Sequence, residues 1–356
     1  MNILHLLSTP TAGISRTALD LCTRLVEDEH SVAVISRGVE AVDAPFKAAG
    51  IPMAKLPLRG AFDLVTPISL AKVLNRMAAP IVVHTHCLRD AATALRARRL
   101  MREPAKVRVV WTHHSAAPAG KGRALQRTCA EVDAFIFPSE AARSAFMASA
   151  PAADQSRLHL VPAAIRPSKA ASVPRSESSE EITLVYIGPI SRAAGLEVLI
   201  RALGKLADRP LRLRIAGTGK AAEVMPIVRM TRTPELKDRV EWLGLVDNPV
   251  QLIDSAHLGL VSADTAETLA MEILEFMSRG VPVIATTSGA TPEIITDGAD
   301  GLLVAPGNAD ALAAAIRRAA TDTKLRKALS DGALRTADRS YDYDDFYWKI
   351  LKIYEQ

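Results

Sequence analysis

Short apolar runs alternate with longer amphipathic segments along the 356 residues of this chain. Apolar runs that end at turn residues are typical of strands buried in a parallel sheet. Between the first two runs, residues 14–26 carry apolar side chains at helical spacing, which predicts a helix. Alternating strands and helices indicate a doubly wound α/β domain. The strands predicted for the first half cover residues 2–7, 31–36, 81–86, 107–112, 133–138 and 158–162.

A segment rich in serine, proline and charge separates this series from a second one. Residues 168–181 show no strand or helix periodicity and predict an interdomain linker. We therefore expect one domain over 1–167, a second α/β domain over 182–335 and an aromatic-rich helical tail over 336–356. The strands predicted for the second domain cover residues 182–187, 211–216, 240–243, 258–261, 281–286 and 301–304.

Composition places the chain among soluble globular proteins. Hydrophobic residues make up 49% of it and charged residues 23%. The three cysteines stand singly, which predicts neither a zinc site nor a disulfide framework and favours a reducing compartment. No apolar run has the length of a signal peptide or a membrane span. We expect a cytoplasmic protein, with the inner face of the membrane as a further possibility.

Basic residues concentrate in the first half of the chain. Residues 1–168 hold 21 Lys and Arg against 13 Asp and Glu, whereas the remainder holds 23 against 26. This surplus fits contact with anionic lipid or attraction of an anionic acceptor, and it equally fits a solvated helix end. No aromatic interleaving accompanies it, so nucleic-acid binding is not expected. The densest cluster comprises Arg96, Arg98, Arg99, Arg102, Lys106 and Arg108.

Two glutamates with seven residues between them carry the most specific signal. Glu267 follows a predicted strand and loop, and Glu275 lies inside the amphipathic helix that comes next. A carboxylate at a strand-to-helix turn can hold sugar hydroxyls, and one further along the helix can hold a ribose. This pattern resembles the Glu-x7-Glu signature of the retaining glycosyltransferases of family 4. The resemblance implies the GT-B fold, with two Rossmann-like domains facing across a cleft and a final helix that crosses back to the first domain.

The resemblance also assigns roles in the first domain. The loop after the first strand looks like the family's glycine-rich loop, which makes Gly13 a donor-binding residue and Arg16 an acceptor-side candidate; Ala12 stands where a second glycine is usual. His114, at the end of a strand, would lie beside the donor sugar as a catalytic residue, in preference to its neighbour His113. His86 is a weaker candidate on the acceptor side.

In the second domain the likeness is closer, with one serious departure. The family places Arg and Lys in its diphosphate-binding loop, where this chain has Pro189 and Ala194. Losing both cations removes charge-assisted contacts of several kcal/mol. Arg192 is the candidate replacement and Lys220 a second one. Glu267 would bind donor-sugar hydroxyls as a catalytic residue. The remaining residues that the resemblance assigns to the donor are Gly188, Arg192, Val246, Leu269, Ala270 and Glu275.

Together these features predict a retaining glycosyltransferase that uses a nucleotide-sugar donor and a glycan or lipid-linked acceptor. Lipopolysaccharide, capsule or glycolipid synthesis is the expected setting. No metal and no other cofactor is expected, because no carboxylate-rich site is visible. Three alternatives stay open: a catalytically silent GT-B subunit, which the missing Arg/Lys pair favours; a sugar-nucleotide epimerase or hydrolase; and a module that only binds nucleotide or sugar.

Overall fold

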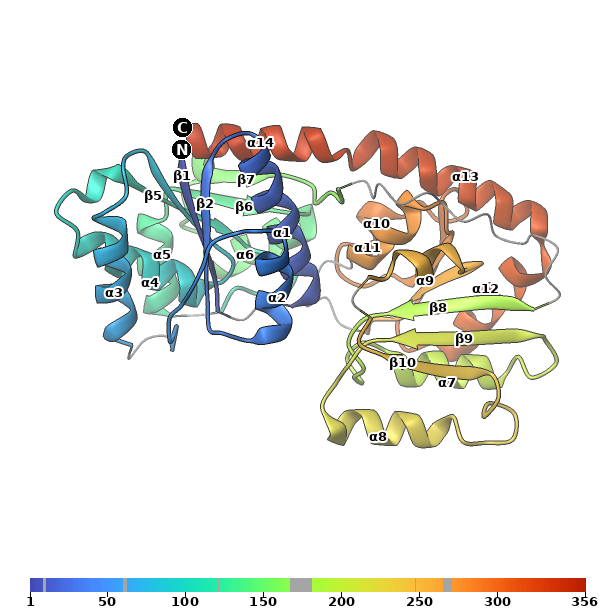
Figure 1. The fold of residues 1–356 in the computed structure, drawn as a ribbon. Helices are drawn as coiled ribbons and strands as arrows, with labels where there is room; N and C mark the ends of the chain where they lie inside the picture. The colour runs from blue at the N-terminus through green and yellow to red at the C-terminus, as the bar shows by residue number, and fades with distance from the viewer. Residues whose placement is uncertain (9–10, 60–62, 121, 167–180, 247, 265–270) are drawn as a thin grey trace. The chain divides into compact units, whose positions relative to one another are not determined.

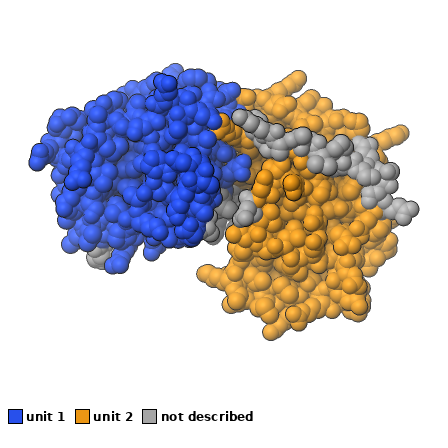
Figure 2. Space-filling model, in the orientation of Figure 1, with its two compact units in different colours: residues 1–164, 343–356 blue, residues 165–342 orange. Residues whose placement is uncertain are grey.

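The computed structural model describes residues 1–356 except 9–10, 60–62, 121, 167–180, 247 and 265–270. The chain forms two compact units, each with its own sheet and core (Figures 1 and 2). The first unit joins Met1–Ala164 to Tyr343–Gln356, and the second comprises Ile165–Asp342. No helix in the described ranges is both long and apolar enough to cross a bilayer.

The C-terminal boundary between the units differs from the predicted residue 336. Helix α13 (Thr323–Ser340) stays with the second unit along its whole length. A Cβ atom on Gly332 would overlap the backbone oxygen of Ala299, and the Thr336 hydroxyl donates to Asp300 at 2.7 Å. These contacts hold the helix beyond residue 336. The segment that belongs to the first unit therefore begins at Tyr343, the first residue of the aromatic helix α14.

Seven parallel strands form the sheet of the first unit, in the order β3-β2-β1-β4-β5-β6-β7. The six strands expected from the sequence are confirmed, and β3 is an addition: three residues at the sheet edge carry too little pattern to predict. The strands are β1 (Asn2–Leu7), β2 (Ser31–Ser36), β3 (Met53–Lys55), β4 (Ile81–Thr85), β5 (Val107–Thr112), β6 (Ala134–Phe137) and β7 (Leu158–Leu160). The helices are α1 (Ala12–Glu27), α2 (Glu40–Ala48), α3 (Val65–Leu74), α4 (Leu88–Arg99), α5 (Arg123–Glu131), α6 (Glu140–Ser149) and α14 (Tyr343–Glu355), with short 3₁₀ turns at Pro104–Lys106 and Gln155–Arg157.

The two faces of this sheet pack into separate cores. Leu4 and Leu6 point to one face, where α4 and Phe146 lie. Ile3 and Leu7 point to the other face, which is covered by α1 and by the aromatic residues of α14. Successive side chains of a strand alternate between the faces, so sequence parity decides which core each residue joins. The helix α14 thus completes the core of the first unit.

The second unit has a six-stranded parallel sheet in the order β10-β9-β8-β11-β12-β13. All six strands predicted from the sequence are confirmed. The strands are β8 (Ile182–Ile187), β9 (Leu211–Ala216), β10 (Val240–Gly244), β11 (Leu258–Val261), β12 (Val283–Thr286) and β13 (Gly301–Val304). The helices are α7 (Leu196–Gly204), α8 (Ala221–Met230), α9 (Val250–Asp254), α10 (Met271–Ser278), α11 (Thr291–Ile294), α12 (Ala309–Thr321) and α13.

Both sheets reverse their strand order beside the first strand of the unit. The reversal falls between β1 and β4 in one sheet and between β8 and β11 in the other. In open parallel sheets, ligands bind at such switch points, outside the carboxyl ends of the strands. The two predicted α/β domains are confirmed, and the switch points indicate where their functional residues lie.

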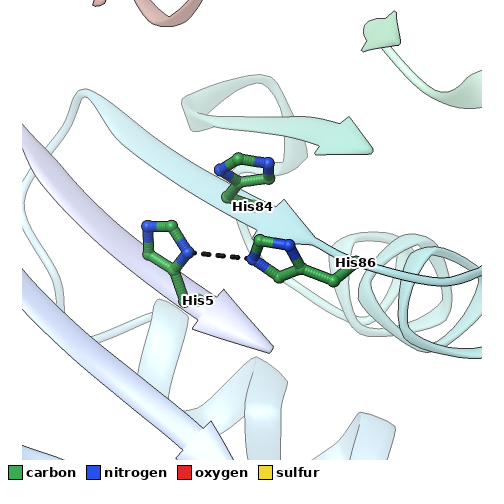
Figure 3. A group of neighbouring side chains, drawn as sticks. All are labelled: His5, His84 and His86. Carbon is green, nitrogen blue, oxygen red and sulfur yellow. Dashed lines mark hydrogen bonds between the residues drawn. The ribbon is translucent and has the colours of Figure 1, made fainter. Parts of the chain in front are cut away.

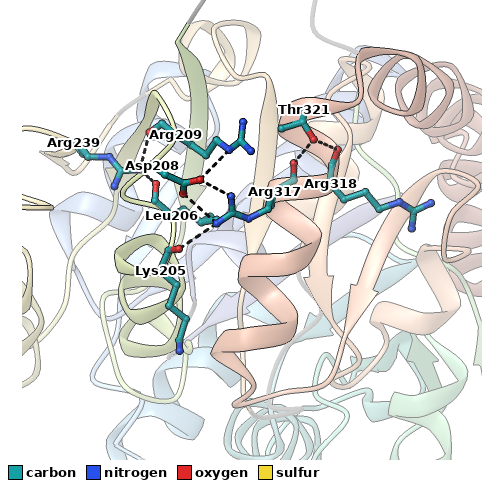
Figure 4. A network of polar contacts seen from close by, with 8 residues as sticks. All are labelled: Lys205, Leu206, Asp208, Arg209, Arg239, Arg317, Arg318 and Thr321. Carbon is teal, nitrogen blue, oxygen red and sulfur yellow. Dashed lines mark hydrogen bonds and ion pairs between the residues drawn. The ribbon is translucent and has the colours of Figure 1, made fainter.

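The opposite, amino end of the second sheet is closed by polar contacts. Arg317 on α12 pairs with both oxygens of Asp208 at 2.7 and 3.1 Å (Figure 4). Arg239 donates to the backbone oxygens of Leu206 and Arg209 in the turn before β9, at 2.9 and 3.3 Å, and to that of Leu211 at the start of β9. Arginine side chains here donate to backbone carbonyl groups and hold the turn before β9 in place. The amino end of the sheet therefore has a structural role.

Three of the six residues of the basic cluster predicted on the first unit form ion pairs within the fold. Arg98 pairs with Asp133 at 2.5 Å, and Arg99 pairs with Glu131. Lys106 pairs with Glu103 at 2.7 Å. These three pairs lower the net positive charge of the cluster, while the side chains of Arg99 and Lys106 remain 57% and 42% exposed, as expected for a solvated helix end.

Candidate active site

Histidines gather at the carboxyl ends of β1, β4 and β5 in the first unit. His5 lies opposite His84 in the β1–β4 register, and His86 follows β4 directly. His114 follows β5 and has the same parity as Val110, which belongs to the core beneath α1 and α14. These four side chains therefore project from one face of the sheet at the β1/β4 switch point.

Three of the rings are hydrogen-bonded end to end. His5 Nδ1 lies 3.1 Å from His86 Nε2, and His86 Nδ1 lies 3.0 Å from His114 Nε2. Figure 3 shows the first of these contacts, with His84 above the pair. The rings of His86 and His114 are stacked, with centroids 5.3 Å apart. Two residues that the sequence placed on different substrates, His86 and His114, are thus in direct contact.

Burial keeps these imidazoles neutral. It lowers the pKa of His5 and of His114 to about 3, and it lowers the pKa of His86 and of His84 well below the ordinary value. Neighbouring histidines add to the effect on His84 and His86, since protonation of one ring disfavours protonation of the next. The cluster is therefore uncharged at neutral pH, and each ring holds a single proton.

His84 ties the C-terminal helix to the sheet. Its Nδ1 lies 2.6 Å from the hydroxyl of Tyr354 on α14, and its Nε2 lies 2.7 Å from the hydroxyl of Thr112 on β5. Both ring nitrogens of this buried residue are satisfied. His84 therefore acts as a bridge that holds α14 against the strands that carry the other histidines.

A buried carboxylate lies at the same switch point. Asp90, in the first turn of α4, accepts a hydrogen bond from the backbone nitrogen of Ser8 at 3.1 Å through Oδ2. Its Oδ1 has no hydrogen-bond partner among the residues that the structure describes. Burial raises the pKa of Asp90. The linear sequence does not single out Asp90, whose one available signal is a carboxylate in the first helical turn after a strand.

Gly13 and Arg16 lie in the first turns of α1, which begins after β1. Thr11 caps this helix by accepting from the backbone nitrogen of Ile14 at 3.3 Å. Arg16 pairs with Asp20 one turn further on, at 3.1 Å. Both predicted residues therefore belong to the helix that starts at the switch point. Their roles toward donor and acceptor stay predictions.

In the second unit, loops at the carboxyl ends of the strands pack backbone to backbone. Gly217, after β9, has a φ of +152°, and a Cβ atom there would overlap the carbonyl oxygen of Gly188 after β8. Gly195, with a φ of +70°, precedes α7, and its Cβ would overlap the backbone oxygen of Ser262 after β11. Only glycine permits both the conformation and the approach. Val246 lies half-buried beyond β10.

The two candidate cations for the diphosphate are both at the surface. Arg192 pairs with Glu197 at 3.3 Å while its side chain remains 82% exposed. An exposed pair of this kind contributes at most about 1 kcal/mol, so a phosphate can replace the carboxylate at small cost. Lys220 precedes α8 and is exposed.

Helix α10, next to the β8/β11 switch point, carries two glutamates. Glu275 is half-buried on its second turn, and Glu272 lies on its first turn. Burial and the nearby charge of Glu275 raise the pKa of Glu272 to about 7. Glu272 in turn adds to the effect of burial that raises the pKa of Tyr186 on β8. The predicted residues Glu267, Leu269 and Ala270 lie outside the described residues.

The structure adds two residues, His5 and Glu272, whose place in the candidate site is not evident from the linear sequence. His5 was assigned only to a strand, yet it forms one end of the histidine chain. A histidine inside an otherwise apolar β1, beside a β4 that carries His84 and His86, was the available signal. Glu272 lies between Glu267 and Glu275, and helical spacing alone does not reveal that burial raises its pKa.

Comparison with known proteins defines the class. A model of Glycosyltransferase Family 4 matches residues 11–169, and a model of Glycosyl transferases group 1 matches residues 181–322. The two matches cover one unit each. Together they cover most of the chain, which therefore belongs to the family-4 type of glycosyltransferases and has two parallel-sheet α/β domains.

Individual relatives are more distant. N-acetyl-α-D-glucosaminyl L-malate synthase of Bacillus anthracis is 25% identical over 183 residues, which are 49% of this chain and 47% of that protein. That match spans about half the length of the relative. D-inositol 3-phosphate glycosyltransferase of Actinosynnema mirum is 26% identical over 390 residues, covering 100% of this chain and 92% of that protein.

A solved structure shares the fold along the whole chain. Alr3699/HepE of Anabaena, determined in complex with UDP and glucose, has a TM-score of 0.85 at 17% identity, with 100% of both chains covered. At this identity the likeness concerns the fold alone. It agrees with the GT-B architecture expected from the sequence.

Proposed function

We propose that the chain is a retaining glycosyltransferase that moves a sugar from a nucleotide-sugar donor to a glycan or lipid-linked acceptor. The observation that carries the proposal is the pair of switch points, each lined by polar side chains in an otherwise apolar sheet. The first holds the buried histidines and Asp90, and the second holds the backbone-packed glycines and α10. Family membership and the UDP complex of HepE support a nucleotide-sugar donor.

The second unit is the proposed donor-binding unit. Glu275 would accept hydrogen bonds from the ribose hydroxyls, while Gly188 lets backbone approach the diphosphate. Arg192 would exchange its pairing with Glu197 for the departing phosphate. His114 and Glu267 would position the sugar ring. Backbone amides and Arg192 would then stabilise the negative charge of the departing diphosphate. We therefore propose that transfer requires no metal ion and that activity persists in the presence of EDTA.

Replacing Glu275 by alanine is expected to weaken donor binding about 10- to 100-fold, because a hydrogen bond to a charged group contributes roughly 1.5–3 kcal/mol. Titration calorimetry with the nucleotide sugar measures this change. The Ser278→Ala variant is the matched control, since Ser278 is exposed one turn further along the same helix. Unchanged affinity in Glu275→Ala removes the ribose role from this residue.

The stereochemical part of the proposal has its own test. Proton NMR of the transfer product reports its anomeric configuration. A retaining mechanism gives a product with the same anomeric configuration as the donor sugar. An inverted product contradicts the retaining mechanism while leaving the donor site intact. Binding of donor without any transfer to sugar or lipid acceptors favours the silent subunit, for which Pro189 and Ala194 in the phosphate loop are the specific observation.

An anionic or membrane-held acceptor is the proposed partner of the first unit, in lipopolysaccharide, capsule or glycolipid synthesis. The inositol phosphate named for the A. mirum relative supports an anionic acceptor. Helix α3 supports peripheral contact with a bilayer: Val65 and Ile68 are 62% and 49% exposed on the helix face that also carries Lys72. An exposed face that combines apolar and cationic side chains is suited to an anionic lipid surface.

We expect the Ile68→Asp and Lys72→Ala variants to lose several-fold in binding to vesicles that contain phosphatidylglycerol, since each juxtamembrane cation contributes about 1 kcal/mol. Co-sedimentation with and without the anionic lipid measures the effect. Met225→Asp is the control, because Met225 is similarly exposed on α8 of the other unit. Equal sedimentation of all four proteins contradicts a membrane contact through α3.

A further inference from the structure

The imidazoles of His5, His86 and His114 form an unbranched chain of two hydrogen bonds, 3.1 and 3.0 Å long. His5 is fully buried and His86 is 8% exposed. His114, half-buried, is the member nearest to solvent. The chain therefore runs from the interior of the sheet toward the carboxyl end of β5, where the donor sugar is proposed to bind.

Neutral imidazoles can form such a chain in only two ways. Each ring has one N–H donor and one bare acceptor nitrogen. If His5 donates from Nδ1, His86 must also donate from Nδ1, and the proton of His114 then sits on its Nδ1. If instead His114 donates from Nε2, His86 must donate from Nε2, and the proton of His5 sits on its Nε2. One ring thus dictates the tautomer of the other two.

The buried end of the chain selects between these directions. His5 Nε2 is buried and has no hydrogen-bond partner within the described part of the chain. A proton there would be a buried donor without an acceptor, a situation that folded proteins rarely contain, whereas an under-used acceptor is tolerated more often. His5 therefore holds its proton on Nδ1, and the whole chain donates toward His114.

We propose that His5 and His86 are positioning residues that fix the Nδ1–H tautomer of His114, so that His114 presents a hydrogen-bond donor to the bound sugar. The ligand in this statement rests on the proposed function; the tautomer does not. A donor at this position would hold a sugar hydroxyl or ring oxygen in place, whereas the other tautomer would present a bare nitrogen. Residues inside the sheet thereby determine whether His114 donates or accepts a hydrogen bond at the carboxyl end of β5.

Two of these rings, those of His5 and His86, also form with His84 the one cluster in the described residues that has the composition of a metal site. Ligand nitrogens of His5, His84 and His86 all lie within 4.8 Å of one another. However, both nitrogens of His84 bond to hydroxyl groups, and the facing nitrogens of His5 and His86 bond to each other. Zinc bound at about 2.0–2.1 Å from each nitrogen would break these bonds. The hydrogen-bonded chain is the arrangement that the distances favour.

Nitrogen-15 NMR of histidine-labelled protein tests the proposal without substrate. Long-range proton–nitrogen correlations distinguish the two ring nitrogens of each of the eight histidines. We expect His5, His86 and His114 to carry the proton on Nδ1, with Nε2 bare, at pH 7. A proton on Nε2 of His114, exchange between both tautomers, or one equivalent of bound zinc in the purified protein would overturn the proposal.

Two variants add a functional readout. Asn at position 86 places an amide donor where His86 Nδ1 lies, so His86→Asn should retain the Nδ1–H tautomer of His114. His86→Leu removes this donor, and we expect His114 to shift to a mixture of tautomers, with kcat falling about tenfold more than in His86→Asn. Equal spectra of His114 in the two variants overturn the proposal, and the wild-type spectrum decides the direction even where a variant does not fold. If the three histidines carry their protons on Nδ1 but the protein binds no nucleotide sugar, the proposed function is refuted and the tautomer assignment stands.

Discussion

The free energy of unfolding of the first unit is expected to fall by on the order of 5 kcal/mol between pH 7 and pH 5. His5, His84 and His86 are buried, and burial places their folded-state pKa values far below the unfolded value of about 6.5. Below pH 6.5 the unfolded chain therefore binds protons that the folded chain does not. Stability is fully present above this pH and declines as the pH falls, by about 2 kcal/mol per histidine at pH 5.

Carboxyl groups with raised pKa values act in the opposite direction. Asp90, in the same unit, has a raised pKa, so protonation on acidification favours the folded state. One carboxyl group stands against these three imidazoles and that of His114, whose pKa is also lowered, so the histidines decide the sign. Glu272 has a folded-state pKa of about 7 and belongs to the second unit, which should become more stable over the same interval. The two units are thus expected to respond to acid with opposite signs.

Urea unfolding, followed by the fluorescence of the buried Trp111, measures the free energy of unfolding of the first unit. Trp242 and Trp348 are replaced by Phe so that Trp111 is the fluorophore observed. The slope of the unfolding free energy against pH counts the protons taken up. The His5→Asn variant should reduce this uptake by about one proton near pH 5.5. His159→Gln, on the edge strand β7, should change it far less. A flat profile between pH 7 and pH 5 contradicts the neutral buried cluster.

The Asp254→Ala variant is expected to lose about 3–5 kcal/mol of stability, because it leaves the charge of a buried guanidinium uncompensated. Asp254 on α9 binds Arg279, just after α10, through two hydrogen bonds of 2.7 and 2.5 Å. Their side chains are 3% and 11% exposed. This pair anchors the end of the helix that carries Glu272 and Glu275, so donor binding should weaken along with stability.

Two comparisons identify the cause of that loss. The double variant Asp254→Leu/Arg279→Met removes both charges and should recover much of the stability, since apolar replacements of a buried pair are often neutral. Asp208→Ala breaks the exposed pair with Arg317 in the same unit and should have a far smaller effect, because solvent screens it (Figure 4). Chemical denaturation of the wild type and the three variants measures these differences in the free energy of unfolding. Equal losses in the single and double variants contradict the charge argument.

The fold was predictable because buried parallel strands are almost uninterrupted apolar runs. Twelve strands were predicted and are present, and the exception, β3, is a three-residue edge strand whose pairing with β2 depends on tertiary contacts. The end of α13 was harder to place, since Gly332 and Thr336 hold the helix through contacts with Ala299 and Asp300 that lie far away in the sequence. Local pattern determines elements, whereas their boundaries depend on packing.

The candidate site was predictable only in part. Successive residues at the end of β5 point to opposite faces of the sheet, so His113 and His114 could be told apart from the sequence. His113 packs against Trp111 and Phe146 on the face opposite to His114. The contact between His86 and His114 depends on two strands pairing side by side, and the protonation of Glu272 depends on burial. The linear sequence carries neither property. Likewise, the pairing of Arg98 with Asp133 shows that a basic run does not by itself define a basic surface.

A thermal-shift panel of UDP-, GDP-, ADP- and dTDP-linked sugars on the wild type and on Glu275→Ala tests the central claim most directly. Ligand at 100 times its dissociation constant stabilises the folded state by about 2.7 kcal/mol, which corresponds to about 5–10 °C for a unit of this size. We predict such a shift with one nucleotide class in the wild type and its loss in the variant. The absence of a shift with every donor would contradict a donor site in the second unit.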